Sequence, residues 1–335
     1  MHWCQENNIP LDFVSTHQYA GDPIAGVEEK SVGAEGEKGG GQEPAGEEQA
    51  KKEQTEKLKM IGRMLEHSQA DSFLSAMRTI LADKSETEEI PNDTFVKNSA
   101  LVRRQSKGLP VFYTEWNENA VFSAYTNDTR KVAAYLLKNI LDVEPNLDGS
   151  SIWCFSDLFE EWHQFPEEFH GGFGLLTLDG VPKPGFYALK MLAQAGEERV
   201  DLGRGAACGE IGVAAFRDAH KMSVFLYRQK MKNLDLPKEE AIITIESDCA
   251  PAKVTLQRID EDHGNPLKVW ETMGRPQDMN REEVKKLKEA SAVTEEDLQF
   301  TYKNGKIVFS ASLAVNDIYC IHLYHKNDHS DPHCI

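Results

Sequence analysis

The sequence predicts an α/β region with a parallel sheet, followed by an all-β region with antiparallel strands. In the first part of the chain, β-rich runs alternate with amphipathic helices, which is the pattern of a parallel α/β fold. After about residue 200, short alternating runs are separated by turn residues. That pattern is typical of an antiparallel β-sandwich. The 335 residues are enough to bury one large core or two medium ones.

Each of the three predicted parallel strands ends in polar residues. The strands cover residues 11–19, 109–117 and 151–157. The carboxyl ends of parallel strands meet at one edge of a sheet, and barrel enzymes carry their active sites at that edge. We therefore expect the polar residues at the three strand ends to lie close together.

The predicted helices have recognisable starts. Asp128 and Thr129 are suited to cap an amphipathic helix over residues 130–141. A second helix is predicted from Pro184 to residue 195. In the all-β region, Asn304-Gly305 predicts a tight hairpin, and residues 282–290 predict one short inserted helix.

Two segments have compositions that do not favour a packed core. Residues 26–57 are dominated by Gly, Glu, Lys, Gln and Ala and contain no aromatic residue, so we interpret them as a flexible acidic insertion. Apolar residues return at helical spacing over 56–82, which predicts one or two helices. The polar tail, residues 326–335, is expected to be frayed.

Composition also excludes several kinds of partner. The formal net charge of −18 argues against binding to nucleic acid or to an anionic membrane surface. No run is long and apolar enough to span a bilayer. The first residues lack the basic and apolar stretches of a signal peptide, and six scattered cysteines without CxxC spacing suggest free thiols. These observations favour a cytoplasmic location.

Glu115 is the first candidate for chemistry. It stands at the end of a predicted strand, followed by Trp116 and Asn117. A carboxylate in this position suits the nucleophile of a retaining glycosidase, which must stabilise an oxocarbenium-like transition state and then form a covalent intermediate. The alternative is a solvated glutamate without a chemical role.

The other strand ends supply groups that could bind a sugar. His17 and Tyr19 stand at the end of the first predicted strand. Trp153, Glu160 and Glu161 accompany the third, where an indole ring can stack on a pyranose and carboxylates can accept from its hydroxyls. A structural histidine and a solvated acidic loop are the alternatives. The histidines and cysteines form no convincing metal set, so we expect no metal and no cofactor.

Several blocks of the sequence resemble successive blocks of the β-xylosidases of glycoside hydrolase family 39. The resemblance covers nearly the whole chain except the insertion and the tail. It implies a partial (β/α)8 TIM barrel, strands six to eight, over residues 1–198 and a β-sandwich domain over 199–325. The blocks, in order, are residues 12–19, 113–117, 153–161, 169–176, 182–184 and 269–276.

The resemblance also implies a reaction and a site. It suggests hydrolysis of terminal β-D-xylosides from the non-reducing end with retention of configuration, without cofactor or metal. Glu115 matches the nucleophile of the family. The positions that match residues contacting xylose in the −1 subsite are His17, Tyr19, Trp153, Glu160 and Glu161.

One departure from the family pattern opens three hypotheses. The acid/base of the family lies in an Asn-Glu-Pro motif, which this sequence lacks, and three strands cannot close a barrel. The chain could be a truncated β-xylosidase that is inactive alone. It could be a non-catalytic sugar-binding module. It could also complete its barrel with a separate N-terminal half, or associate with copies of itself. An iduronidase-like specificity would need a cation at the strand ends, where we find none.

Overall fold

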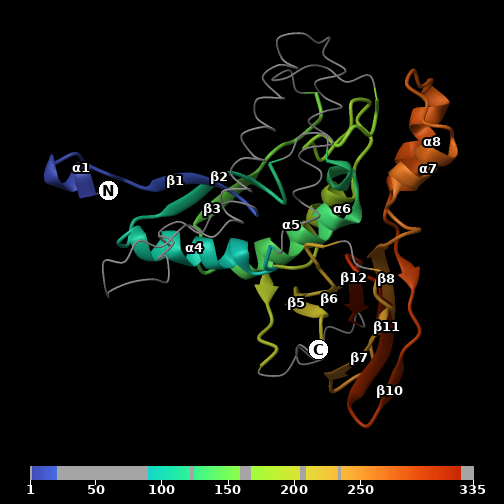
Figure 1. Ribbon diagram of the computed structural model, residues 1–335. Helices are drawn as coiled ribbons and strands as arrows, with labels where there is room; N and C mark the ends of the chain where they lie inside the picture. Colours follow the sequence, from blue (N-terminus) through green and yellow to red (C-terminus); the bar gives the residue numbers. More distant parts are fainter. Residues whose placement is uncertain are drawn as a thin grey trace, which may run out of the picture.

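The structure is a computed structural model that describes residues 2–20, 90–120, 124–158, 167–203, 209–232 and 235–325 (Figure 1). The predicted insertion at 26–57, the helices predicted over 56–82 and the tail 326–335 lie outside the described residues. Within the described part, the chain forms mixed α/β structure first and antiparallel sheets afterwards.

The three predicted strands form one parallel sheet. They are β1 (Val14–Tyr19), β2 (Val111–Asn117) and β3 (Gly149–Ile152), in the order β1-β2-β3. Both neighbouring pairs are parallel, so the carboxyl ends of all three strands lie at one edge, as the sequence predicted. The third strand is shorter than predicted and ends before Trp153.

Helices connect these strands. Helix α5 (Arg130–Val143) begins after a 3-10 turn, η1 (Tyr125–Asp128), and Thr129 caps it by accepting a hydrogen bond from the backbone of Lys131. Helix α6 (Pro184–Ala193) begins with proline in its first turn, where the missing N–H costs nothing. The sequence analysis did not predict α4 (Thr94–Gln105), and a short helix, α1 (His2–Glu6), precedes β1.

Two antiparallel sheets follow. One has six strands in the order β4-β5-β6-β12-β8-β9, and the other has three in the order β10-β11-β7. Asn304 and Gly305 have φ angles of 53° and 71° and join β10 to β11 as a two-residue hairpin, as predicted. The strands are β4 (Glu198–Arg199), β5 (Gly212–Arg217), β6 (Lys221–Tyr227), β7 (Glu239–Glu246), β8 (Lys253–Ile259), β9 (Glu296–Asp297), β10 (Thr301–Lys303), β11 (Lys306–Leu313) and β12 (Ile318–Tyr324).

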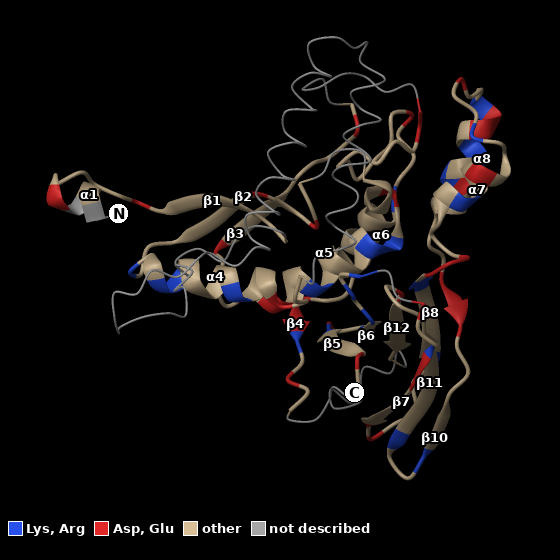
Figure 2. Ribbon diagram, viewed as in Figure 1, with Lys and Arg blue, Asp and Glu red and all other residues tan. Residues whose placement is uncertain are grey.

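Two helices stand between β8 and β9. Helix α8 (Arg281–Ser291) matches the predicted short helix and begins with a capping box formed by Asn280 and Glu283. Helix α7 (Pro266–Thr272) was not predicted. Acidic and basic side chains alternate along both helices (Figure 2), which suits a solvent-exposed face.

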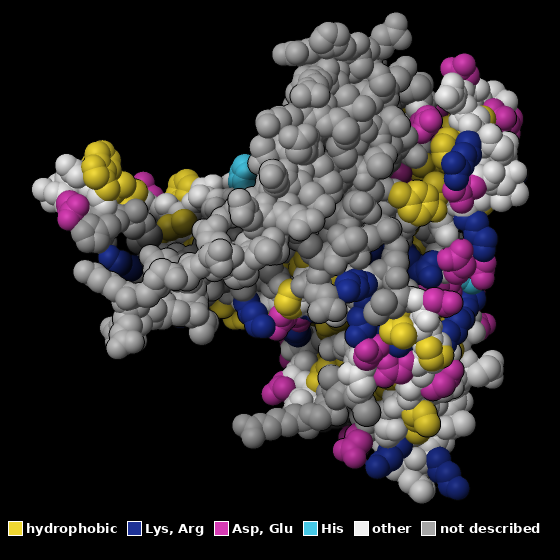
Figure 3. Space-filling view, in the orientation of Figure 1, with side chains coloured by type: hydrophobic (Ala, Val, Ile, Leu, Met, Phe, Trp, Pro, Cys, Tyr) yellow, Lys and Arg dark blue, Asp and Glu magenta, His cyan; other side chains and the backbone are white. Residues whose placement is uncertain are grey.

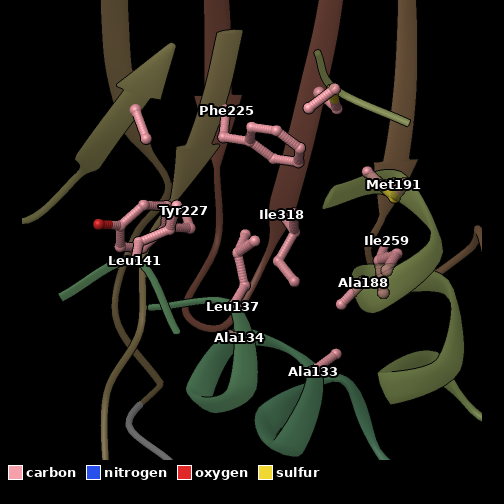
Figure 4. Close-up of a cluster of buried hydrophobic side chains, with 13 residues drawn as sticks. Ala133, Ala134, Leu137, Leu141, Ala188, Met191, Phe225, Tyr227, Ile259 and Ile318 are labelled. Carbon is pink, nitrogen blue, oxygen red and sulfur yellow. The ribbon is translucent and has the colours of Figure 1, made fainter. Parts of the chain in front are cut away.

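Helix α5 is buried on two faces, because it lies between the parallel sheet and the six-stranded sheet. Val132 and Leu136 belong to the core beneath β1 and β2. Ala133 and Leu137 belong to a second core, which α6, β6, β8 and β12 complete (Figure 4). A third core joins the two antiparallel sheets. The parallel sheet is therefore anchored to the rest of the molecule through α5.

The prediction that all six cysteines are free thiols is wrong, as Cys249 shows. Cys4, Cys154 and Cys320 are free, but Cys249 takes part in a disulfide bond. Cysteine spacing could not reveal this, because a disulfide needs two side chains that meet in space. Disulfides are rare in reducing compartments, so this bond weighs against the predicted cytoplasmic location. In the described part of the chain, no helix has the length and hydropathy needed to cross a membrane.

Candidate active site

Glu115 contacts both sugar-binding candidates from the neighbouring strand. The Tyr19 hydroxyl donates a short hydrogen bond to Oε1 of Glu115. The other oxygen, Oε2, lies 3.5 Å from Nδ1 of His17. The Glu115 side chain is 22% exposed and that of His17 is 57% exposed. The carboxylate is thus held on one side and accessible on the other.

A register shift between β1 and β2 explains this encounter. Thr16 pairs with Tyr113, but the next residue, His17, pairs with Glu115, so Thr114 is skipped. Such an irregularity re-aims side chains, and it is common beside active sites. At the end of the two strands, Tyr19 pairs with Asn117.

The backbone of Trp153 is fixed at the end of β3. Its N–H donates to the carbonyl of Trp116 at 3.0 Å, and its carbonyl accepts from Nδ2 of Asn117 at 2.5 Å. Trp116 is fully buried. Asn117 therefore links the residue after β3 to the strand that carries Glu115. The sequence analysis named Asn117 only as a neighbour of Glu115.

The structure therefore brings together three of the predicted site residues, Glu115, Tyr19 and His17. Trp153 lies at the end of the adjacent strand, where backbone hydrogen bonds hold it. Glu160 and Glu161 lie outside the described residues.

A buried lysine supports the ends of β3 and α5. Nζ of Lys183 lies 2.6 Å from Oδ1 of Asp128 and 2.6 Å from Oδ2 of Asp157, and none of the three side chains is more than 2% exposed. Burial raises the pKa of Asp128. Burial alone would lower the pKa of Lys183, but the two carboxylates outweigh it and raise the pKa above its ordinary value.

A glycine-rich turn closes around this lysine. The N–H groups of Gly171 and Gly174 donate to Asp128 and Asp157, each at 2.7 Å, and the carbonyl of Gly172 accepts from Lys183. A Cβ atom on Gly174 would lie 2.3 Å from the backbone nitrogen of Asp157. Only glycine fits so close to the backbone at Asp157.

A second buried ion pair lies just beyond β2. Nζ of Lys131 lies 2.9 Å from Oε1 of Glu118, and both side chains are at most 3% exposed. The other Glu118 oxygen accepts from Asn119, which also donates to Asn127, and Asn127 donates to the carbonyl of Gly171. Polar contacts therefore join the segment after Glu115 to the glycine-rich turn.

The chemistry available here is that of a carboxylate. Burial raises the pKa of Cys154, the nearest free thiol in sequence, to about 11, so the thiol stays protonated near neutral pH and is a poor nucleophile. The described residues contain no group of three or more side chains arranged to hold a metal ion. A partly exposed carboxylate that keeps a fixed phenol donor can attack a carbon electrophile or stabilise a developing cation.

Comparison with known proteins places these features in one family. A family model described as glycosyl hydrolases family 39 matches residues 51–307. A β-xylosidase of Caldicellulosiruptor saccharolyticus is 26% identical over 95% of this chain and 55% of its own length. A β-xylosidase of Geobacillus stearothermophilus is 26% identical over 98% of this chain and 55% of its own length. The chain spans about half the length of these relatives.

Solved structures show the same fold. An enzyme of family 39 from Xanthomonas axonopodis pv. citri superposes with a TM-score of 0.58 at 22% identity, over 71% of this chain and 50% of the other. A family 39 β-xylosidase from Caulobacter crescentus superposes with a TM-score of 0.58 at 18% identity, over 96% of this chain and 53% of the other.

Proposed function

This chain belongs to glycosyl hydrolases family 39, and we propose that it acts on terminal β-D-xylosides as a retaining glycosidase with Glu115 as the nucleophile. The observation that carries the proposal is the position of Glu115, which has one oxygen fixed by Tyr19 and a side chain that remains accessible. The curated relatives named β-xylosidases support the substrate class.

The proposed reaction is a double displacement through a glycosyl-enzyme intermediate at Glu115. In the first step, a carboxylate oxygen forms a bond to the anomeric carbon of xylose while the bond to the leaving-group oxygen breaks, and the electron pair leaves with that oxygen. In the second step, water attacks the anomeric carbon, the Glu115 carboxylate leaves, and the proton of the water passes to solvent. Tyr19 orients the attacking carboxylate. We assign His17, Trp153, Glu160 and Glu161 to binding the xylose in the −1 subsite, with Trp153 as the stacking surface.

The fold supports a partial barrel. We propose that β1, β2 and β3 correspond to strands six to eight of a (β/α)8 barrel within residues 1–198, and that residues 199–325 form a β-sandwich domain. In the described part of the chain, β1 and β3 each pair only with β2, so the outer edges of both strands remain open.

We also propose that this chain alone lacks the general acid that protonates the leaving group. The sequence contains no Asn-Glu-Pro motif. The contacts of the Glu115 carboxylate within the described residues are Tyr19 and His17, and neither is a carboxylic acid. Because general acid catalysis contributes roughly 10²–10⁴-fold, we expect the chain alone to react with activated xylosides and to leave unactivated ones almost unchanged.

A second candidate function is that of a half-enzyme. Within the described residues, β1 and β3 pair only with β2, and these edges favour a segment that adds the remaining strands and supplies the acid/base. Under this hypothesis, a polypeptide containing Asn-Glu-Pro would restore hydrolysis of unactivated xylosides when mixed with this chain. A non-catalytic sugar-binding module is the third alternative, and it would bind xylose without ever forming a covalent adduct.

The decisive experiment is covalent labelling with a 2-deoxy-2-fluoro-xyloside that carries a dinitrophenolate leaving group. Such a leaving group departs without a proton, so the experiment tests the nucleophile alone. We expect intact mass to increase by one fluoroxylosyl group and peptide mapping to place it on Glu115. The Glu115→Gln variant should remain unlabelled, whereas Glu144→Gln, which alters an exposed carboxylate, should label normally. Absence of label on a folded wild-type chain would reject the proposed nucleophile.

A further inference from the structure

We propose that the chain also binds a neutral xylan segment at a second site, in two adjoining pockets beside Tyr125. The pockets have volumes of about 280 and about 270 Å³ and share Tyr125, Leu267 and Glu271. The choice of xylan rests on the proposed function, whereas the pockets and their chemistry do not. Neither pocket includes Glu115, Tyr19 or His17.

The pockets lie between two parts of the fold. Tyr125 opens η1, on the connection from the carboxyl end of β2 to α5. Phe169 and Gly171 stand on the connection from β3 to α6, and α7 supplies the opposite wall with Leu267 and Trp270. Both connections leave the sheet edge that carries Glu115, so a chain held here would be kept near the proposed active site.

Tyr125 offers a surface for a sugar ring. Its side chain is 60% exposed, and within the described residues its hydroxyl has no hydrogen-bond partner. The wall behind it is rigid, because Trp270 is 3% exposed, packs on Phe169 and donates its indole N–H to the carbonyl of Pro276. An exposed phenol ring above a fixed apolar wall suits stacking against the face of a pyranose.

The charges lining the pockets favour an uncharged ligand. Among the described residues, four Lys and Arg side chains line them, and each already pairs with a carboxylate, so none of these four is left unpaired to bind an anion. The pairs are Arg130 with Glu261, Lys131 with Glu118, Lys268 with Asp262 and Arg275 with Glu271. The exposed amide of Gln277 and the second carboxylate oxygen of Glu271, Oε2, remain available to sugar hydroxyls.

The molecular surface agrees with this character. On the face next to α7 and α8, Figure 3 shows hydrophobic side chains directly beside acidic and basic ones. Small-molecule sites combine apolar surface with a few polar groups in this way, and a sugar uses both, through stacking and hydrogen bonds.

The test is affinity electrophoresis of the full chain in native gels that contain soluble xylan. A xylan chain has many internal residues and one non-reducing end, so a site specific for terminal xylosides retards the protein little. We expect the wild type to be retarded. Tyr125→Ala should weaken the apparent affinity about tenfold, the loss of one aromatic stacking contact. Tyr125→Phe should retain most of the retardation, because the ring remains.

Two further variants make the result decisive. Ile242→Ala removes an exposed apolar side chain from β7, outside the pockets, and should migrate like the wild type. Gln277→Ala should weaken binding without removing a buried group. Equal retardation of Tyr125→Ala and the wild type, or no retardation of the folded wild type, would overturn the second site.

The labelling and retardation experiments distinguish the second site from the proposed nucleophile. If Glu115 is labelled but xylan does not retard the chain, this inference alone fails. If retardation depends on Tyr125 but Glu115 stays unlabelled, the proposed nucleophile alone fails.

Discussion

Replacing Lys183 by methionine is expected to destabilise the protein strongly. The ammonium group lies 2.6 Å from the carboxylates of both Asp128 and Asp157, with all three side chains buried. Methionine fills a similar volume but leaves two buried carboxylates without a cation. Removing one partner of a buried ion pair costs about 3–5 kcal/mol, which is a large fraction of the roughly 5–15 kcal/mol that stabilises a typical protein.

The free energy of unfolding of the full chain is measured by urea denaturation at pH 7. The difference between variants is taken from the shift of the urea midpoint at a constant m-value. Lys190→Met provides a matched control, because Lys190 is exposed on α6, the helix that begins directly after Lys183, and it should change the free energy of unfolding by about 0.5 kcal/mol or less. A triple variant that combines Lys183→Met with Asp128→Asn and Asp157→Asn should recover part of the loss. It removes the unpaired charges and keeps the acceptors for Gly171 and Gly174.

The pH dependence of this loss has a definite sign. Burial raises the folded-state pKa of Asp128, so the protonated form is favoured by folding. The stability that this group contributes is present below its ordinary pKa and is lost as pH rises through the folded value. Without Lys183 that pKa rises further, so the deficit of Lys183→Met should shrink as pH falls from 7 to 5. A variant as stable as Lys190→Met at pH 7 would refute the reasoning.

Two further predictions follow from the contacts. Tyr19→Phe should slow formation of the fluoroxylosyl adduct about 10–100-fold, because it removes one hydrogen bond to a charged group. An unchanged time course of adduct formation, followed by intact mass, would remove Tyr19 from the mechanism. Burial lowers the pKa of His322 to about 4, so folding favours its neutral form. The resulting contribution to stability is present above about pH 6.5 and is lost as pH falls towards 4. The loss in the free energy of unfolding amounts to about 3 kcal/mol at most. The melting temperature of His322→Gln should therefore depend less on pH over this range than that of the wild type.

Local patterns were sufficient for the elements that carry the candidate site. The polar ends of β1 and β2, the cap at Thr129 and the hairpin at Asn304 were all predicted and found. Helix α4 was missed, because its 12 residues have a mean hydropathy too low and an apolar face too weak to stand out. The disulfide at Cys249 was also missed, because spacing along the chain does not report distance in space.

The sequence alone identifies the set of reactive groups and the strand ends on which they stand. Glu115, Tyr19 and His17 could be named because periodicity assigns strands and parallel strands end at a common edge. Which of these groups are in contact depends on the tertiary structure. The register shift places His17 beside Glu115, and helix packing buries Lys183 between Asp128 and Asp157. Pairing and burial depend on residues far apart in the chain, so no local pattern could predict them.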